Sequence, residues 1–159
     1  DLFYDYYTQE PVHGQGSTVT LTDVAYDTIP LYYRGGSIIP QRIESANTTK
    51  ALRTKDFELI IALSANGTAS GNLYLDDGVS IEQAATSDIK FEYSDRTLKV
   101  SGTFAYKTDS VIAGVTVLGG SGTSGGYGGQ HSYTGYRGKP QGQVIKQKIP
   151  LTGPTTIHL

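Results

Sequence analysis

Short apolar and β-branched runs, separated by glycine-rich or polar connections, make up most of the chain. Residues 57–63, FELIIAL, are almost continuously apolar, which is typical of a strand covered on both faces. Further strand-like runs follow at 72–75, 89–94, 97–104 and 111–118, with turn residues between them. Short strands at this spacing predict an antiparallel β-sandwich.

The beginning of the chain also reads as strands. Residues 2–8, LFYDYYT, are rich in aromatic side chains, and residues 17–22, STVTLT, alternate small polar residues with Val19 and Leu21. A turn at 14–16, GQG, is expected to join these two strands.

The next segment, IPLYYRGGSIIP at 29–40, contains two apolar runs divided by Gly35 and Gly36. The two glycines indicate a bulge or a tight turn. The guanidinium of Arg34, just before them, could bind a carboxylate or backbone carbonyls through its fork of donors. We therefore expect a buried or interface structural role for Arg34, Gly35 and Gly36, with a solvated strand end as the alternative for Arg34.

Three other stretches lack the strand pattern. Residues 44–56 are polar and form the best candidate domain boundary, and residues 80–86, SIEQAAT, are the only helix-like segment, too short to stand alone. Residues 119–142 carry no hydrophobic period over a length that is unusual inside a compact domain, which indicates a functional or flexible loop. Strand-like alternation returns at 144–151 and 155–159.

Composition supports the all-β class and excludes several functions. The 159 residues include 20 Gly and 12 Tyr, with many Thr, Val and Ile, which suits strands and turns. The net charge of −2 and the dispersed basic residues argue against nucleic-acid binding. No apolar stretch approaches the roughly 20 residues of a membrane span. Cysteine is absent, which excludes disulfides and thiolate metal sites.

Two N-x-[ST] sequons, at Asn47 and Asn66, lie in polar, turn-like stretches and predict N-glycosylation. Together they favour a secreted glycoprotein. The chain opens at Asp1, inside a run that reads as a strand, and lacks an initiator Met and a signal peptide. This start suggests a processed or nicked product of a longer precursor.

Asp76 and Asp77 are the most conspicuous candidate pair of catalytic carboxylates. Paired glycosidase carboxylates must face one sugar, whereas consecutive residues of a strand point to opposite faces. A calcium loop needs acidic residues at alternating positions, which this segment lacks. We expect a turn in which Asp77 accepts local N–H groups and Gly78 supplies a positive φ, with metal binding and catalysis as the weaker alternatives.

Other candidate chemistry is sparse. The three histidines have no metal-ligand spacing, and no nucleophile elbow or phosphate-binding loop is present. We expect no metal and no cofactor. Tyr127, Tyr133 and Tyr136 in the Gly/Tyr-rich loop could stack on sugar rings, and an exposed linker explains them about as well.

The segments LFYDYYT, TIPLYYRGGSIIP, FELIIAL and NGTASGNLYLDDG occur in an order that resembles the C-terminal region of glycoside hydrolase family 31. More narrowly, residues 1–118 resemble the secreted eukaryotic α-glucosidases of the maltase type. The closing IPLTGPTTIHL is again similar to that family, whereas the Gly/Tyr-rich loop departs from its pattern.

The resemblance implies that residues 1–45 are the later part of a proximal C-terminal β-sandwich. Residues 46–159 would then form the distal one, with the Gly/Tyr-rich loop at 119–143. It also implies that the catalytic aspartates of a retaining mechanism lie in a (β/α)₈ barrel outside this chain. The expected function is a non-catalytic part of an α-glucosidase that acts on maltose-like oligosaccharides. The expected partner is the remainder of the enzyme, as a separate chain or a processed product. The alternative is a carbohydrate-binding module that uses the Tyr-rich loop.

Overall fold

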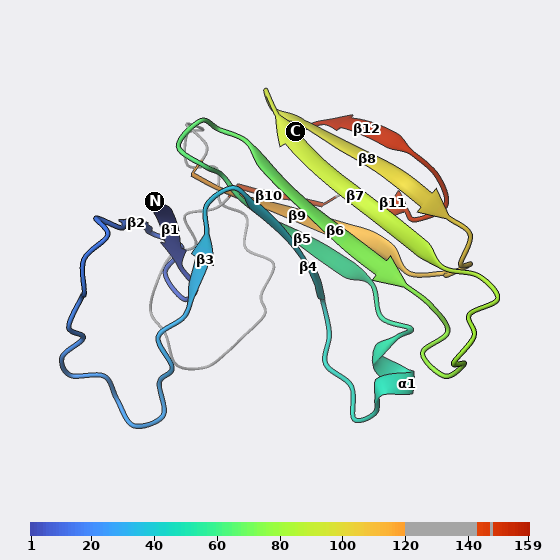
Figure 1. Ribbon diagram of the computed structural model, residues 1–159, viewed down its shortest axis with the longest axis horizontal. Helices are drawn as coiled ribbons and strands as arrows, with labels where there is room; N and C mark the ends of the chain where they lie inside the picture. Colours follow the sequence, from blue (N-terminus) through green and yellow to red (C-terminus); the bar gives the residue numbers. More distant parts are fainter. Residues whose placement is uncertain (120–142, 147) are drawn as a thin grey trace.

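The computed structural model describes residues 1–119, 143–146 and 148–159, which form two β-sheets and one short helix (Figure 1). The all-β, sandwich-like class expected from the sequence is confirmed. The larger sheet has nine strands in the order β10-β9-β5-β4-β6-β7-β8-β12, with β11 also beside β9. These strands are β4 (Ser37–Arg42), β5 (Phe57–Ala62), β6 (Ala69–Leu75), β7 (Ser87–Ser94), β8 (Thr97–Phe104), β9 (Val111–Leu118), β10 (Gln143–Ile145), β11 (Ile149–Pro150) and β12 (Thr155–His158).

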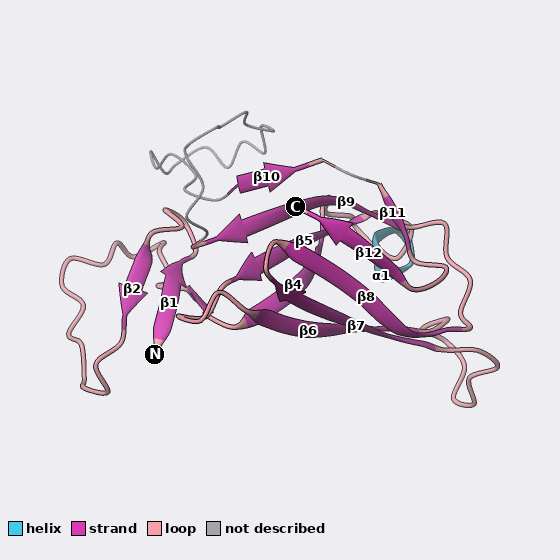
Figure 2. Ribbon diagram, turned by 90° about the horizontal axis from the view of Figure 1, so that it is seen from above, coloured by secondary structure: helices cyan, strands magenta, loops and turns pink. Residues whose placement is uncertain are grey.

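The larger sheet curls, so that β5 and β9 lie opposite β7 and β8 (Figure 2). Most of its pairs are antiparallel, while β5 runs parallel to β9 and β4 is parallel to β6. β7 alternates buried and exposed residues along its whole length, as is typical of a strand with one solvent-exposed face. Its inward side chains join the main core, whose largest fully buried members include Leu59, Ile61, Ile89, Phe91, Leu98, Ile112 and Val115.

β5 is covered on both faces, as its continuous apolar run predicts. Leu59 and Ile61 point into the main core, while Ile60 and Ala62 face a second apolar cluster on the other side of the sheet. Since successive side chains of a strand alternate between faces, a strand buried twice must be apolar at every position. The exception is Glu58, which is half-buried and accepts a hydrogen bond from the Gln41 side chain of β4.

The smaller sheet has the order β2-β1-β3 and packs through Tyr4 onto the larger one. Its strands are β1 (Leu2–Asp5), β2 (Pro11–His13) and β3 (Tyr32–Arg34), all antiparallel. The Tyr4 side chain is 1% exposed, and its hydroxyl donates a 2.9 Å hydrogen bond to the Leu63 carbonyl. The hydroxyl lies over Gly119, where any Cβ would collide with it. The hydrogen bond from Tyr4 to Leu63 joins the two sheets across 59 residues of sequence.

The prediction of a strand at 17–22 is wrong, because this segment belongs to a long connection between β2 and β3. Val19 and Leu21 are exposed there, and no described strand pairs with the segment. The strand expected at 2–8 ends at Asp5, whose carboxylate accepts the N–H groups of Tyr7 and Thr8 and turns the chain.

The helix-like segment at 80–86 is not helical. The one described helix, α1 (Thr49–Leu52), lies instead in the polar stretch expected to be a boundary, where the Thr48 hydroxyl accepts the N–H of Ala51 as an N-cap. No helix in the described ranges is long and apolar enough to span a membrane.

The chain passes from one sheet to the other at Gly35 and Gly36. A Cβ on Gly35 would approach the carbonyls of Leu2 and Leu63, and Gly36 has φ +89°. The sequence grouped residues 37–42 with the first unit, whereas in the structure this segment is β4, between β5 and β6 of the larger sheet. The two sheets therefore separate at the glycine pair, because the second apolar run of this segment pairs with FELIIAL.

Candidate functional site

Asp77 organises the exposed loop between β6 and β7. One oxygen of its carboxylate accepts the N–H groups of Val79 and Ser80, both at 2.9 Å, and the other accepts the Ser80 hydroxyl at 2.5 Å. The Gln83 side-chain amide donates to the first of these two oxygens at 3.1 Å. These hydrogen bonds, the Ser80 hydroxyl first, hold the pKa of Asp77 well below its usual range.

Asp76 and Gly78 both meet Arg53, which the sequence analysis did not single out. The Arg53 guanidinium donates to the Asp76 carbonyl and forms a 2.9 Å ion pair with the Asp76 carboxylate. Gly78 has φ +69°, and a Cβ there would lie 2.6 Å from the same guanidinium. The only sequence signal for this contact is a basic residue in the polar stretch before FELIIAL.

This loop does not have the arrangement of a catalytic carboxylate pair. The carboxylate of Asp76 turns to Arg53, and that of Asp77 turns back onto its own loop. The described residues contain no group of three or more side chains that could hold a metal ion. The local geometry is that of a turn tied to a neighbouring segment.

Arg34 is exposed at the end of β3, and none of the ion pairs among the described residues involves it. It is therefore not buried within this chain, and the interface role stays a prediction. A different arginine is half-buried: the Arg42 guanidinium lies 3.7 Å above the Phe57 ring and donates to the Lys55 carbonyl and the Ser110 hydroxyl. Burial lowers the pKa of Arg42.

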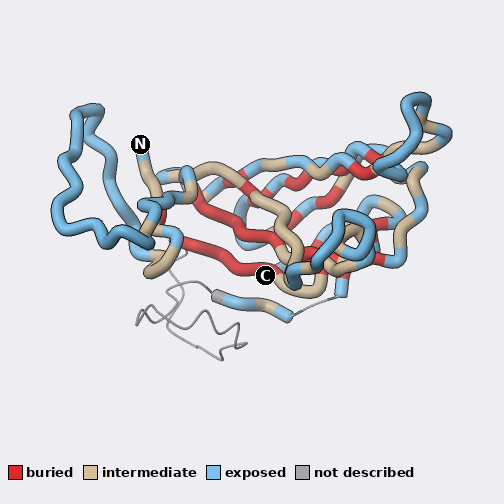
Figure 3. Tube along the Cα trace, turned by 90° about the horizontal axis from the view of Figure 1, so that it is seen from below, coloured by how far each residue is buried: buried red, intermediate tan, exposed pale blue. Residues whose placement is uncertain are grey.

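Large exposed apolar side chains are frequent among the first 32 residues of the chain. The connection between β2 and β3 lies pale blue along nearly all its length in Figure 3, away from the core. Tyr26 and Ile29 on this connection are 110% and 68% exposed. The apolar face comprises the exposed large residues between 6 and 32, namely Tyr6, Val12, Val19, Leu21, Val24, Tyr26, Ile29, Leu31 and Tyr32.

Tyrosine rings near the start of the chain contact one another. The rings of Tyr6 and Tyr33 lie 5.3 Å apart, and Tyr6 meets Tyr7 edge-on at 5.1 Å. Burial, with smaller contributions from Tyr6 and Glu58, raises the pKa of Tyr33 far above its ordinary value. Burial also raises the pKa of Tyr4. Both phenols therefore stay neutral at physiological pH.

Both sequon asparagines are exposed. Asn47 lies just before the N-cap of α1, and Asn66 lies in the short loop between β5 and β6. Tyr127, Tyr133 and Tyr136, the candidate sugar contacts, lie outside the described residues.

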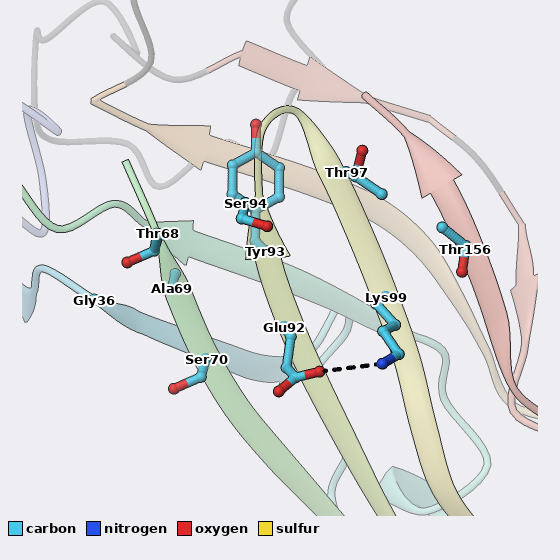
Figure 4. Close-up of a pocket in the computed structure, with 10 residues that line it drawn as sticks. All are labelled: Gly36, Thr68, Ala69, Ser70, Glu92, Tyr93, Ser94, Thr97, Lys99 and Thr156. Carbon is cyan, nitrogen blue, oxygen red and sulfur yellow. Dashed lines mark ion pairs between the residues drawn. The ribbon is translucent and has the colours of Figure 1, made fainter. Parts of the chain in front are cut away.

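A hollow of about 540 Å³ with a mixed polar and apolar lining lies on the outer face of the larger sheet (Figure 4). Its lining comes from β6, β7, β8 and β12, with Gly36 at one side. Across it, the Lys99 ammonium and the Glu92 carboxylate lie 3.8 Å apart. We call this feature the outer hollow.

Comparison with known proteins finds relatives that are named as glucosidases. No protein-family model matches it. It is 48% identical over 159 residues to a probable α/β-glucosidase of Neosartorya fischeri, covering 100% of this chain and 18% of that protein. A probable α/β-glucosidase of Arthroderma benhamiae is 45% identical over 170 residues, covering 100% and 19%. Glucoamylase 1 of Schwanniomyces occidentalis is 40% identical over 119 residues, covering 75% and 12%.

Solved structures show the same fold. The glucosidase II α subunit with α3-Glc2 bound superposes with a TM-score of 0.63 at 22% identity, over 75% of this chain and 14% of that one. The ER glucosidase II heterodimeric complex gives a TM-score of 0.62 over the same shares. At this identity the likeness concerns the fold alone.

The fold is β-sandwich-like, and the chain corresponds to a small region of much longer relatives that are named as glucosidases. Over its whole length the chain matches relatives of this kind and resembles the C-terminal region of glycoside hydrolase family 31, as the motifs around the glycine pair and Asp76–Gly78 indicate. It spans about a fifth of the length of the first two curated relatives.

Proposed function

We propose that this chain is a non-catalytic C-terminal part of a retaining α-glucosidase that hydrolyses terminal α-linked glucose from maltose-like oligosaccharides. One observation carries the proposal: relatives named as glucosidases match the chain over its whole length, yet the match takes up only 18% of their own length. A region of this size leaves ample chain elsewhere for a catalytic domain.

The local chemistry supports a non-catalytic role. A retaining pair needs two carboxyl groups about 5 to 5.5 Å apart that face one sugar. Asp76 and Asp77 are adjacent but engaged with Arg53 and with the loop backbone. A carboxylate with a strongly lowered pKa, such as Asp77, is also a poor general acid at neutral pH.

The apolar face supports a packing role. Soluble monomers rarely expose large contiguous apolar patches, and such patches usually mark interfaces. The connection between β2 and β3 presents Val19, Tyr26 and Ile29 to solvent in this chain. We infer that the rest of the enzyme, with its catalytic barrel, covers this face and is stabilised by the contact.

The cellular setting belongs to the same proposal. A secreted enzyme would carry N-glycans on Asn47 and Asn66, and the exposure of both side chains permits this modification. The rest of the enzyme would be bound to this region, either as a separate chain or as a processed product. Neither nucleic acid nor a membrane is required for this function.

Matched tyrosine variants of the full-length enzyme test the packing role. Tyr26 lies on the apolar face, and Tyr74 is a second exposed tyrosine on the larger sheet. We expect Tyr26→Ser to lower the melting temperature by several degrees without changing KM for maltose, because it removes buried aromatic area. Tyr74→Ser should have a much smaller effect. Equal, negligible effects of both variants would contradict packing through this face.

A further inference from the structure

The outer hollow is built from a row of polar side chains that crosses four strands. The strand register places Ser70 beside Glu92, Glu92 beside Lys99, and Lys99 beside Thr156. Residues of one face recur at every second position of a strand, so these four side chains all point outward. Ser94 and Thr97 line the hollow at the turn that joins β7 to β8 (Figure 4).

The chemistry of this lining suits a sugar. Serine and threonine hydroxyls both donate and accept hydrogen bonds, while Lys99 donates and Glu92 accepts. The Lys99–Glu92 pair is long at 3.8 Å, and its side chains are 61% and 63% exposed, so both ions retain capacity for further hydrogen bonds.

One end of the outer hollow is formed by the loop that carries Asn66. The loop is held tightly, since the Ser64 N–H donates to the Thr68 carbonyl and the Gly67 N–H donates to the Ser64 carbonyl, both at 2.9 Å. The hydroxyls of Ser64 and Thr68 lie 3.0 Å apart. Thr68 is the third residue of the Asn66 sequon and also lines the hollow. A glycan on Asn66 would therefore begin two residues before a side chain of the lining.

We propose that the outer hollow is the seat of the N-glycan carried by Asn66. The first N-acetylglucosamine residues lie across β6, β7 and β8, and their hydroxyl and acetamide groups hydrogen bond to Glu92, Lys99 and Thr97. This inference rests on the proposed secreted origin of the enzyme, since only then is Asn66 modified. The seated glycan covers the outer face of this part of the larger sheet.

Asn47 provides an internal comparison. It is exposed before α1, and no residue near it in sequence lines the outer hollow. A glycan on Asn47 has the same chemistry and no seat there. The two glycans of one protein should therefore differ in their accessibility to an endoglycosidase under native conditions.

The test uses the full-length enzyme secreted from a eukaryotic host that attaches high-mannose glycans. Native protein is treated with an endoglycosidase that cuts within the chitobiose core, and site-resolved mass spectrometry follows release at each asparagine. We expect release at Asn66 to be at least about tenfold slower than at Asn47. The double variant Glu92→Ala/Lys99→Ala should abolish the difference, whereas Lys90→Ala, on the same outer face of β7 but outside the lining, should preserve it.

Each outcome decides one of the two proposals. Equal release rates, or an unmodified Asn66 beside a glycosylated Asn47, would overturn the glycan seat and leave the secreted origin standing. Bare asparagines at both sites of the secreted enzyme would overturn the glycan seat, whereas an enzyme that the host keeps in its cytosol would overturn the secreted origin, and the seat with it. Slow release at Asn66 that persists in the Glu92→Ala/Lys99→Ala variant would also contradict the seat, because the protection would then come from elsewhere.

Discussion

Replacing Tyr4 by phenylalanine is expected to loosen the smaller sheet from the larger one. The substitution removes one hydroxyl and leaves the ring, so little apolar contact is lost. In the wild type that hydroxyl is fully enclosed and donates to the Leu63 carbonyl at 2.9 Å. A buried acceptor that loses its partner costs about 1 to 3 kcal/mol.

Hydrogen exchange in the full-length enzyme measures this cost locally, where a global unfolding curve of a multidomain protein would not. A loss of 1 to 3 kcal/mol corresponds to roughly 5- to 150-fold faster exchange of the β1 and β3 amides. Exchange in β7, which belongs to the main core, should be unchanged. Tyr74→Phe serves as the control because the Tyr74 side chain is exposed on the larger sheet, outside the apolar face.

The reasoning would be refuted if Tyr4→Phe left the exchange of β1 and β3 as slow as in the wild type. Equal acceleration in β1, β3 and β7 would also contradict it, because the hydroxyl would then support the whole fold. Tyr4→Ala should cost more, about 3 to 5 kcal/mol, since the ring itself is buried.

Three further predictions concern the β6–β7 loop and the tyrosines. Asp76→Asn should leave the turnover of the full-length enzyme nearly intact; a loss beyond about 100-fold in folded protein would show that Asp76 is catalytic. Gly78→Val should destabilise this part of the enzyme by about 1 kcal/mol or more, because φ is positive and the new side chain meets Arg53; an unchanged melting temperature would count against this. Because burial raises the folded-state pKa of Tyr33 and Tyr4, their contribution to stability is fully present below pH about 10 and declines as the pH rises further. Denaturation midpoints measured through the alkaline range should therefore fall less steeply in Tyr33→Phe than in the wild type, and identical slopes would contradict the assignment.

The strands that the sequence predicts best are those with a strong pattern. FELIIAL is apolar at nearly every position because β5 is buried on both faces. β7 alternates apolar and polar residues because one of its faces is exposed to solvent. STVTLT has the same alternation as a strand, yet it lies exposed in this chain. Local alternation reports which residues would fit a strand, while a strand forms only where another chain segment supplies the partner edge.

The connections were harder to predict, because they depend on long-range contacts. Arg53 contacts Asp76 across 23 residues, and Tyr4 contacts Leu63 across 59. Neither contact has a local signature. β4 pairs with β5 although a polar stretch with its own short helix separates them, which is why the sheets divide at Gly35 and Gly36 rather than near residue 45.

The most direct test of the account compares the full-length enzyme with this chain expressed alone, on maltose and on an aryl α-glucoside. We predict hydrolysis of both substrates by the full-length enzyme. The chain alone should show no turnover, and it should associate through its apolar face or remain attached to the barrel-bearing part when the two are co-expressed. A soluble monomer of this chain with α-glucosidase turnover, or a folded full-length enzyme with none, would contradict the assignment.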